Sequence, residues 1–218
     1  MEDPRKAPKH RAIFLDRDGT LMDEVNFCDD PAHVRAIPGA AKSLAELRRH
    51  GWLNIIVTNQ SGIGRGYFTI VDYQAVNAEL FRQLGGAIDA AYVSPDHPDR
   101  ATHRRKPGTG MIEEASRDQG VAPEKSWFVG DKDSDILCGR TAGCKTILVL
   151  TGYGRQHRDC GANFIARDIV EAAQIILRET KLPPQQSSPP AGPRPDFLAN
   201  PSSPSWANLS FNMSGNVA

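Results

Sequence analysis

A chain of 218 residues leaves room for one domain of roughly 180 residues with an apolar core, plus a short additional segment. The 26 Lys and Arg residues balance the 26 Asp and Glu residues, so net charge gives no reason to expect binding to nucleic acid or to a membrane. No apolar run approaches the roughly 20 residues that span a bilayer, and residues 1–11 lack the apolar centre of a signal peptide. We therefore expect a cytoplasmic protein, and we expect it to be a monomer.

Predicted strands and helices alternate from residue 12 to residue 179, which is typical of a parallel sheet covered by helices. The first strand, residues 12–15, is wholly apolar, as in strands that are buried on both faces. The later strands are predicted at 53–57, 88–93, 126–129 and 145–150, with a short edge strand at 164–165. The predicted fold class is therefore α/β: a Rossmann-like, doubly wound, mostly parallel sheet with helices on both faces and no inserted cap domain.

Five helices are predicted between these strands and after the last one. The first follows Gly39 and stops at Gly51, a residue suited to the position just after a helix. The second begins after Thr69, where Asp72 completes a capping box, and its core-facing stripe consists of Tyr73, Val76, Leu80 and Leu84. The others are predicted at 109–119, in a short segment that ends at residue 142, and at 168–179.

The composition of the chain changes at Lys181. Residues 181–218 hold half of the 16 prolines, many serines and few apolar residues, so they cannot bury enough surface to offset the entropy of ordering. We therefore predict three parts: a flexible N-terminus at 1–10, one α/β domain at 11–180 and a disordered tail at 181–218.

Polar side chains follow several predicted strands at their carboxyl ends, which lie along one edge of a parallel sheet. They are Asp16 and Asp18, Thr58 and Asn59, and Asp131, with Lys106 in the loop after the third strand. On their own, the first two acids are equally compatible with a solvated turn. Three carboxylates that meet repel one another unless a cation binds them, and oxygen ligands of this kind suit Mg²⁺. A hydroxyl, an amide and an ammonium hold phosphoryl oxygens, so the pattern indicates magnesium-assisted phosphoryl transfer.

Four short motifs resemble those of the haloacid dehalogenase (HAD) superfamily, in the same order and at the same strand ends. They are Asp16-Arg-Asp-Gly-Thr, Thr58-Asn59, Lys106 and Gly130-Asp-Lys-x-x-Asp135. The resemblance implies that Asp16 is a nucleophile that forms an aspartyl-phosphate, and that Asp18 is the general acid and base. It also implies that Mg²⁺ binds the Asp16 carboxylate, the Asp18 backbone carbonyl and Asp131. Lys106 would neutralise charge on the phosphoryl oxygens, and Asp135 would support these residues without binding the metal itself.

Residues 11–178 are most similar to the D-glycero-D-manno-heptose 1,7-bisphosphate 7-phosphatases, chiefly through the run from Thr58 to Thr69. The resemblance implies a small phosphorylated sugar as substrate, in the supply of nucleotide-activated heptose for lipopolysaccharide. The residues it implies for substrate binding are Glu24, Val25, Asn26, Phe27, Thr58, Asn59, Gln60, Ser61, Arg105, Lys106 and Lys132. Arg105 is suited to a second phosphate or to a sugar hydroxyl.

One loop departs from the pattern of this family, in which three cysteines and one histidine hold a zinc ion. Residues 94–98 and 102–104 stand at those positions without any cysteine, and the four cysteines of the chain are scattered. Two histidines, His97 and His103, remain in the loop, but without soft partners they are typical of solvated side chains. We therefore expect no zinc, and we expect the loop that shapes substrate choice to be altered.

Three other functions share some of these sequence features. Histidinol phosphate or another small phosphosugar is the alternative substrate. A non-catalytic phosphosugar-binding protein on the same fold would usually have lost one of the four motif residues Asp16, Asp18, Lys106 and Asp131, and none is lost. The Gly62-x-Gly-x-Gly66 run lacks the spacing of a dinucleotide-binding loop, so it is better explained as a turn near the phosphate.

Overall fold

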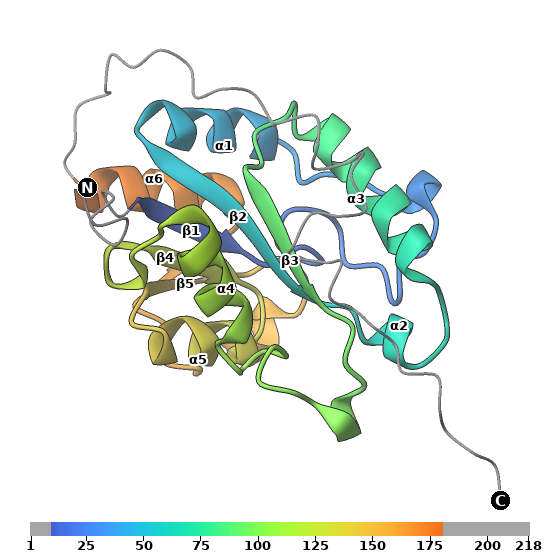
Figure 1. Ribbon diagram of the computed structural model, residues 1–218. Helices are drawn as coiled ribbons and strands as arrows, with labels where there is room; N and C mark the ends of the chain where they lie inside the picture. The colour runs from blue at the N-terminus through green and yellow to red at the C-terminus, as the bar shows by residue number, and fades with distance from the viewer. Residues whose placement is uncertain (1–9, 181–218) are drawn as a thin grey trace, which may run out of the picture.

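The computed structural model describes residues 10–180, drawn in colour in Figure 1. The predicted tail at 181–218 lies outside the described residues, and so does the predicted flexible N-terminus apart from His10, which forms a bridge with Val121. The described residues form one sheet with its helices and contain no inserted cap domain. No helix within 10–180 has the length and apolar character needed to cross a membrane.

Six parallel strands form the sheet in the order β3-β2-β1-β4-β5-β6. They are β1 Arg11–Leu15, β2 Trp52–Asn59, β3 Ala90–Ser94, β4 Trp127–Gly130, β5 Lys145–Val149 and β6 Phe164–Ala166. The strand order changes direction between β1 and β4, because β2 and β3 extend the sheet to one side and β5 and β6 to the other. Ligands of open α/β sheets bind outside the carboxyl ends of the strands at such a switch point.

Helices cover both faces of this sheet (Figure 1). They are α1 Ala40–Arg49, α2 Ser61–Gly64, α3 Ile70–Gln83, α4 Gly110–Gln119, α5 Asp133–Thr141 and α6 Ile169–Thr180, with 3-10 turns η2 Pro31–His33, η3 Pro98–Arg100, η4 Pro123–Lys125 and η5 Gly154–His157. One core contains Ile13 and Leu15 of β1 with apolar residues of α1, α3 and α6. The other contains Ala12 and Phe14 with residues of α4 and α5. This double burial explains the wholly apolar sequence of β1.

The predicted helix signals are confirmed. Thr69 and Asp72 form the capping box of α3, in which the Thr69 side chain accepts from the Asp72 N–H and the Asp72 carboxylate accepts from the Thr69 N–H. The core-facing stripe of this helix is buried as predicted. Gly51 follows α1 with a φ of 79°, a left-handed conformation that glycine adopts without strain.

Several element boundaries differ from the prediction by one or two residues, most clearly those of β2 and β3. Strand β2 continues through Thr58 and Asn59, because these residues pair in register with β3. Strand β3 begins at Ala90 rather than at residue 88, since the Asp89 carboxylate accepts from the Asn54 N–H at 2.8 Å and pairs with Arg48 at 3.0 Å. The glycine-rich run after β2 contains the short helix α2 instead of a simple turn.

Candidate active site

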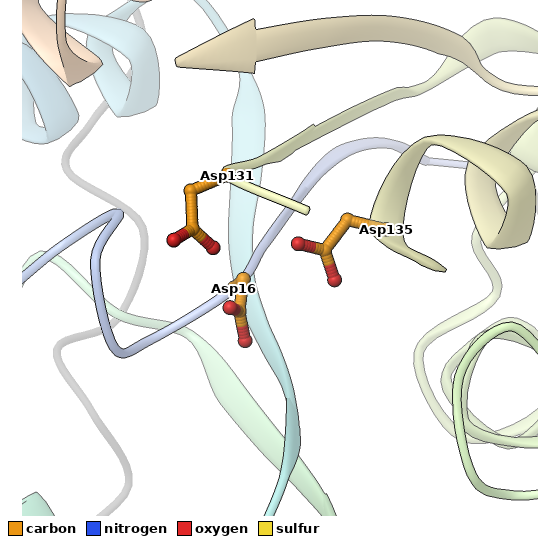
Figure 2. A group of neighbouring side chains, drawn as sticks. All are labelled: Asp16, Asp131 and Asp135. Atoms are coloured by element: carbon orange, nitrogen blue, oxygen red, sulfur yellow. The ribbon is translucent and has the colours of Figure 1, made fainter. Parts of the chain in front are cut away.

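Three aspartates meet beyond the carboxyl ends of β1 and β4 (Figure 2). Asp16 directly follows β1, where its N–H still donates to the carbonyl of Val129 on β4 at 3.0 Å. Asp131 directly follows β4, and Asp135 lies in the first turn of α5. Each offers a carboxylate oxygen, and these oxygens lie within 4.8 Å of one another. All three side chains are buried, so the sheet concentrates negative charge at its switch point.

Lys106 supplies positive charge to two of these carboxylates. Its Nζ lies 2.7 Å from Asp16 Oδ1 and 2.7 Å from Asp135 Oδ1, and it also donates to the Val57 carbonyl at 2.8 Å. The backbone of Lys106 is held by Asn59, whose side-chain amide accepts from the Lys106 N–H at 3.0 Å and donates to the Lys106 carbonyl at 3.1 Å. Asn59 therefore aligns the lysine through its backbone, a role that the sequence did not reveal.

The charges of this cluster do not balance, and the pKa values reflect that. Burial opposes ionisation of Asp16, but the charge and hydrogen bond of Lys106 leave its pKa below the ordinary value. Burial, together with the charges of Asp16 and Asp135, raises the pKa of Asp131 to about 8. Its buried Oδ1 has no hydrogen-bond partner. An unpartnered carboxylate oxygen beside two further carboxylates fits a hard divalent cation such as Mg²⁺.

The backbone around Asp131 is built from glycines. Its Oδ2 accepts from the N–H of Tyr153 at 2.8 Å. Gly19 and Gly152 pack against the same carboxylate with φ values of 78° and 50°, and a Cβ on either would collide with Asp131 Oδ2. Both positions therefore require glycine, for the backbone conformation and for the close approach. Gly152 and Tyr153 were missed from the sequence, where the only signal was a glycine-rich turn after β5.

Asp18 is held by side chains on two sides. Its Oδ2 accepts from Arg17 Nε at 3.0 Å and from Gln60 Nε2 at 2.8 Å, while its Oδ1 accepts from Arg17 Nη2 at 3.0 Å. Gln60 also donates to the hydroxyl of the buried Thr58 at 2.9 Å. Arg17 was missed from the sequence, and Gln60, predicted as a substrate contact, bonds the predicted acid/base in this structure.

A cavity of about 450 Å³ opens beside these groups. The predicted acid/base Asp18 lines it, together with most of the predicted substrate residues: Glu24, Val25, Asn26, Phe27, Asn59, Gln60, Ser61, Arg105, Lys106 and Lys132. It is also lined by Cys28, Ser134, Tyr153 and His157, which were not predicted. A smaller cavity of about 40 Å³ shares part of this lining and is bounded as well by Asp16, Thr58 and Asp135. The predicted nucleophile therefore lines a small cavity that shares lining residues with a larger one, and the larger one is able to hold the rest of a substrate.

The larger cavity carries cations on its wall. Lys132 Nζ lies 3.6 Å from Glu24 Oε2 and 4.6 Å from the centre of the Tyr153 ring. Arg105 Nη1 donates to the Asp96 carbonyl at 3.2 Å. Burial opposes the charge of Lys132, but the surrounding acids, Asp16 first, keep its pKa above the ordinary value. With Lys106, these residues give the cavity the positive charge that an anionic ligand requires.

The loop before Lys106 is closed by hydrogen bonds. Asp96 Oδ2 accepts from the Thr102 N–H at 2.8 Å and from the Thr102 hydroxyl at 2.6 Å. His103 Nε2 lies 2.9 Å from Glu113 Oε1, and His97 Nδ1 accepts from the Asp99 N–H at 3.2 Å. The two histidines thus contact different partners, His97 within the loop and His103 in α4.

Comparison with known proteins agrees with this geometry. Residues 103–172 match the model of the HAD-hydrolase-like family. The D-glycero-β-D-manno-heptose-1,7-bisphosphate 7-phosphatase of Haemophilus ducreyi is 38% identical over 153 residues, which cover 65% of this chain and 84% of that protein. The chain belongs to this phosphatase family. Another relative of this phosphatase, the D-glycero-α-D-manno-heptose-1,7-bisphosphate 7-phosphatase of Burkholderia mallei, is 38% identical over 73% of this chain and 90% of its own length.

Two solved structures share the fold of this phosphatase. The D,D-heptose 1,7-bisphosphate phosphatase of B. bronchiseptica, complexed with magnesium and phosphate, matches with a TM-score of 0.72 and 31% identity over 78% of this chain and 99% of that one. A HAD-like phosphatase from Mesorhizobium loti matches with a TM-score of 0.66 and 30% identity, over 83% of this chain and 91% of its own. The predicted Rossmann-like HAD fold is thereby confirmed, and so is the assignment to the phosphoric monoester hydrolases.

Proposed function

We propose that this phosphatase removes the 7-phosphate of D-glycero-D-manno-heptose 1,7-bisphosphate through an aspartyl-phosphate on Asp16. The observation that carries the proposal is the position of Asp16, which lies 2.7 Å from Lys106 Nζ and lines a small cavity together with Lys106 and Lys132. A carboxylate kept ionised by a buried ammonium is suited to nucleophilic attack on phosphorus. The similarity to heptose bisphosphate phosphatases supports the choice of substrate.

The first step breaks the ester bond. A carboxylate oxygen of Asp16 attacks phosphorus, the bond between phosphorus and the sugar oxygen breaks, and Asp18 gives a proton to that departing oxygen. Lys106 holds the nucleophile on one side and balances charge on the phosphoryl oxygens on the other. Thr58 lines the smaller cavity together with Asp18, and its hydroxyl is the proposed donor to the phosphoryl oxygens. The products of this step are the free sugar hydroxyl and the aspartyl-phosphate.

The second step restores Asp16. Asp18, now ionised, takes a proton from water as the water oxygen attacks phosphorus, and the bond between phosphorus and the Asp16 oxygen breaks. Orthophosphate leaves, and Asp18 is protonated again for the next substrate. The carboxylates of Asp16 and Asp131 and the backbone carbonyl of Asp18 are the ligands proposed for Mg²⁺, which when bound offsets the negative charge of the phosphoryl group. Asp135 is already bonded to Lys106 and to the Lys132 N–H, so it supports Lys106 rather than the metal.

The rest of the substrate occupies the larger cavity in this proposal. Arg105 and Lys132 are placed to bind the second phosphate or the sugar hydroxyls, because both cations lie on the wall of that cavity. Glu24, Val25, Asn26, Phe27 and Ser61 line it as well and are the proposed contacts to the sugar.

A panel of phosphate esters tests the proposed substrate. We expect Mg²⁺-dependent phosphate release to be fastest with the α- or β-anomer of heptose 1,7-bisphosphate, and ³¹P NMR should show loss of the 7-phosphate signal while the 1-phosphate persists. Faster release from histidinol phosphate would overturn the choice of substrate but not the phosphatase activity. If the protein released phosphate from none of the esters while circular dichroism showed an intact fold, the result would instead favour a non-catalytic phosphosugar-binding protein.

We also propose that the loop of residues 94–105 closes without zinc. The two bonds from Thr102 to the Asp96 carboxylate join the positions where zinc-containing family members have ligands. Metal analysis of the purified protein is expected to find less than a tenth of a zinc ion per chain. A value near one zinc per chain would contradict this proposal. The domain limits at 11–180, the monomeric state and the cytoplasmic location remain predictions from the sequence.

A further inference from the structure

Arg17 stands between the two aspartates of the first motif, and it is completely buried. Its exposed fraction is 0%, and it is among the largest fully buried side chains of the described residues. Removing a guanidinium from water is costly unless its donors are satisfied by good partners. The partners of Arg17 therefore indicate why the fold keeps a charged side chain in this place.

The guanidinium of Arg17 bridges Asp18 and helix α3. Nε and Nη2 each lie 3.0 Å from one oxygen of the Asp18 carboxylate, which is the paired, planar geometry that arginine and carboxylate favour. On the other side, Nη1 donates to Asn77 Oδ1 at 3.1 Å, and the guanidinium lies 5.3 Å from the centre of the Tyr73 ring. Since Asn77 and Tyr73 both belong to α3, Arg17 ties the Asp18 carboxylate to a rigid helix.

The result is an Asp18 carboxylate with a fixed direction. Gln60, which directly follows β2, donates from its Nε2 to Asp18 Oδ2 at 2.8 Å, so a second element holds the same carboxylate. The carboxylate retains 15% exposure, and Asp18 lines both the larger and the smaller cavity. Proton transfer to a leaving oxygen requires a donor oriented within hydrogen-bond reach, so the direction of this side chain matters more than its mere presence.

We propose that Arg17 is a positioning residue for general acid catalysis: with Gln60 it takes three of the four acceptor positions of the Asp18 carboxyl and so leaves one on Oδ1, where the proton that passes to the sugar oxygen is held as the phosphorus–oxygen bond breaks. The inference rests on the proposed function and adds a residue to it. This role of Arg17 predicts that the effect of removing it depends on the leaving group of the substrate. Alkyl esters need that proton because an alkoxide is a poor leaving group, whereas p-nitrophenolate departs without it.

Two substrates separate this role from a purely structural one. The measured quantity is kcat/KM, which reports the steps up to the first irreversible one, here cleavage of the ester bond. We expect Arg17→Met to lower kcat/KM on the order of 100-fold with the heptose phosphate ester, in the range found for general acids, and by less than about tenfold with p-nitrophenyl phosphate. In an Asp18→Asn background, Arg17→Met should cause little further loss with the alkyl ester. Equal losses with both esters, or none, would overturn the inference.

Matched variants keep the test independent of folding. Arg48→Met also removes a half-buried arginine paired with an aspartate at 3.0 Å, but far along the chain from the motif, and it should change the two kcat/KM values by the same small factor. If Arg17→Met does not fold, Arg17→Lys and Asn77→Ala carry the comparison: each keeps part of the contacts and should show a smaller loss, again selective for the alkyl ester. A loss without that selectivity in both variants would refute the role of Arg17. Wild-type protein inactive on both esters would refute the proposed function itself.

Discussion

Replacing Lys106 by methionine removes the ammonium that joins Asp16 and Asp135. Its Nζ lies 2.7 Å from an oxygen of each carboxylate, and all three side chains are nearly inaccessible to solvent. Methionine fills a similar volume without charge, so the main change is electrostatic. Two buried carboxylates are then left beside Asp131 without the cation that compensated them.

The expected cost follows from that arrangement. Removing one partner of a buried ion pair destabilises proteins by about 3–5 kcal/mol, because the other charge stays buried and uncompensated. Lys106 pairs with two carboxylates, so we expect its replacement to lower the free energy of unfolding by an amount in this range near pH 8. In the variant the pKa values of both carboxyls rise above their unfolded values. The loss should therefore be smaller near pH 5, where the folded protein can take up protons, and grow as the pH increases.

Urea denaturation in the presence of a chelator measures this loss at both pH values. Arg82→Met is the control, since Arg82 forms an exposed pair with Glu79 one turn away on α3 and its loss should leave stability close to that of the wild type. Lys106→Met combined with Asp135→Asn should recover part of the stability, because one of the uncompensated charges is gone. If Lys106→Met were no more destabilising than Arg82→Met, the description of the site as a buried charge cluster would be wrong.

Three further predictions concern the metal ligands and the tail. Near pH 7 the Asp131 carboxyl holds a proton because its pKa is raised to about 8, so calorimetry in buffers of different ionisation heat should show that Mg²⁺ binding releases a proton at pH 7 and none above about pH 9. Gly152→Ala drives a Cβ against Asp131 Oδ2, so the Mg²⁺ affinity measured by calorimetry should fall about 10–100-fold. Deletion of residues 182–218 should leave phosphate release unchanged, because the lining of both cavities lies within residues 16–157.

Each of these predictions has a contrary result. Mg²⁺ binding without proton release at pH 7 would mean that Asp131 is ionised before the metal arrives. Gly143→Ala is the control for Gly152→Ala: its φ is 87°, but a Cβ there meets nothing within 4 Å, so it adds backbone strain without the collision and should keep the affinity. Equal losses of Mg²⁺ affinity in the two variants would show that backbone strain, and not the collision with Asp131, lowers the affinity. A large loss of activity on deletion would mean that the tail belongs to the enzyme.

Asp16 and Asp131 could be placed together from the sequence alone. Both follow apolar strands, and parallel strands end at one edge whatever their order in the sheet, so the sequence places both acids on that edge. The family motifs put them in one site, and the structure shows the reason, because β1 and β4 are neighbours. Lys106 was assigned to the site by a motif rather than by a strand end, and its Nζ lies 2.7 Å from Asp16 Oδ1 in the structure. These residues needed only local patterns and one topological rule.

The partners of the remaining polar groups depend on the tertiary structure. Asn59 and Gln60 carry amides that bond equally well with a ligand or with protein, and only the packed sheet shows that they hold the Lys106 backbone and Asp18. The sequence gives no signal for Arg17, because arginine is seldom fully buried and nothing in the motif shows that α3 provides Asn77 as its acceptor. Gly152 stands in a glycine-rich turn whose sequence does not reveal its contact with Asp131, since that contact joins segments about 20 residues apart.

Phosphate release by Asp16→Asn tests the central claim most directly. An amide oxygen at this position has the same shape but not the nucleophilic charge, so the variant should keep its melting temperature within a few degrees of the wild type while Mg²⁺-dependent release of phosphate becomes undetectable. A variant that still releases phosphate at a rate comparable to the wild type would contradict the assignment of Asp16 as nucleophile, and with it the aspartyl-phosphate route.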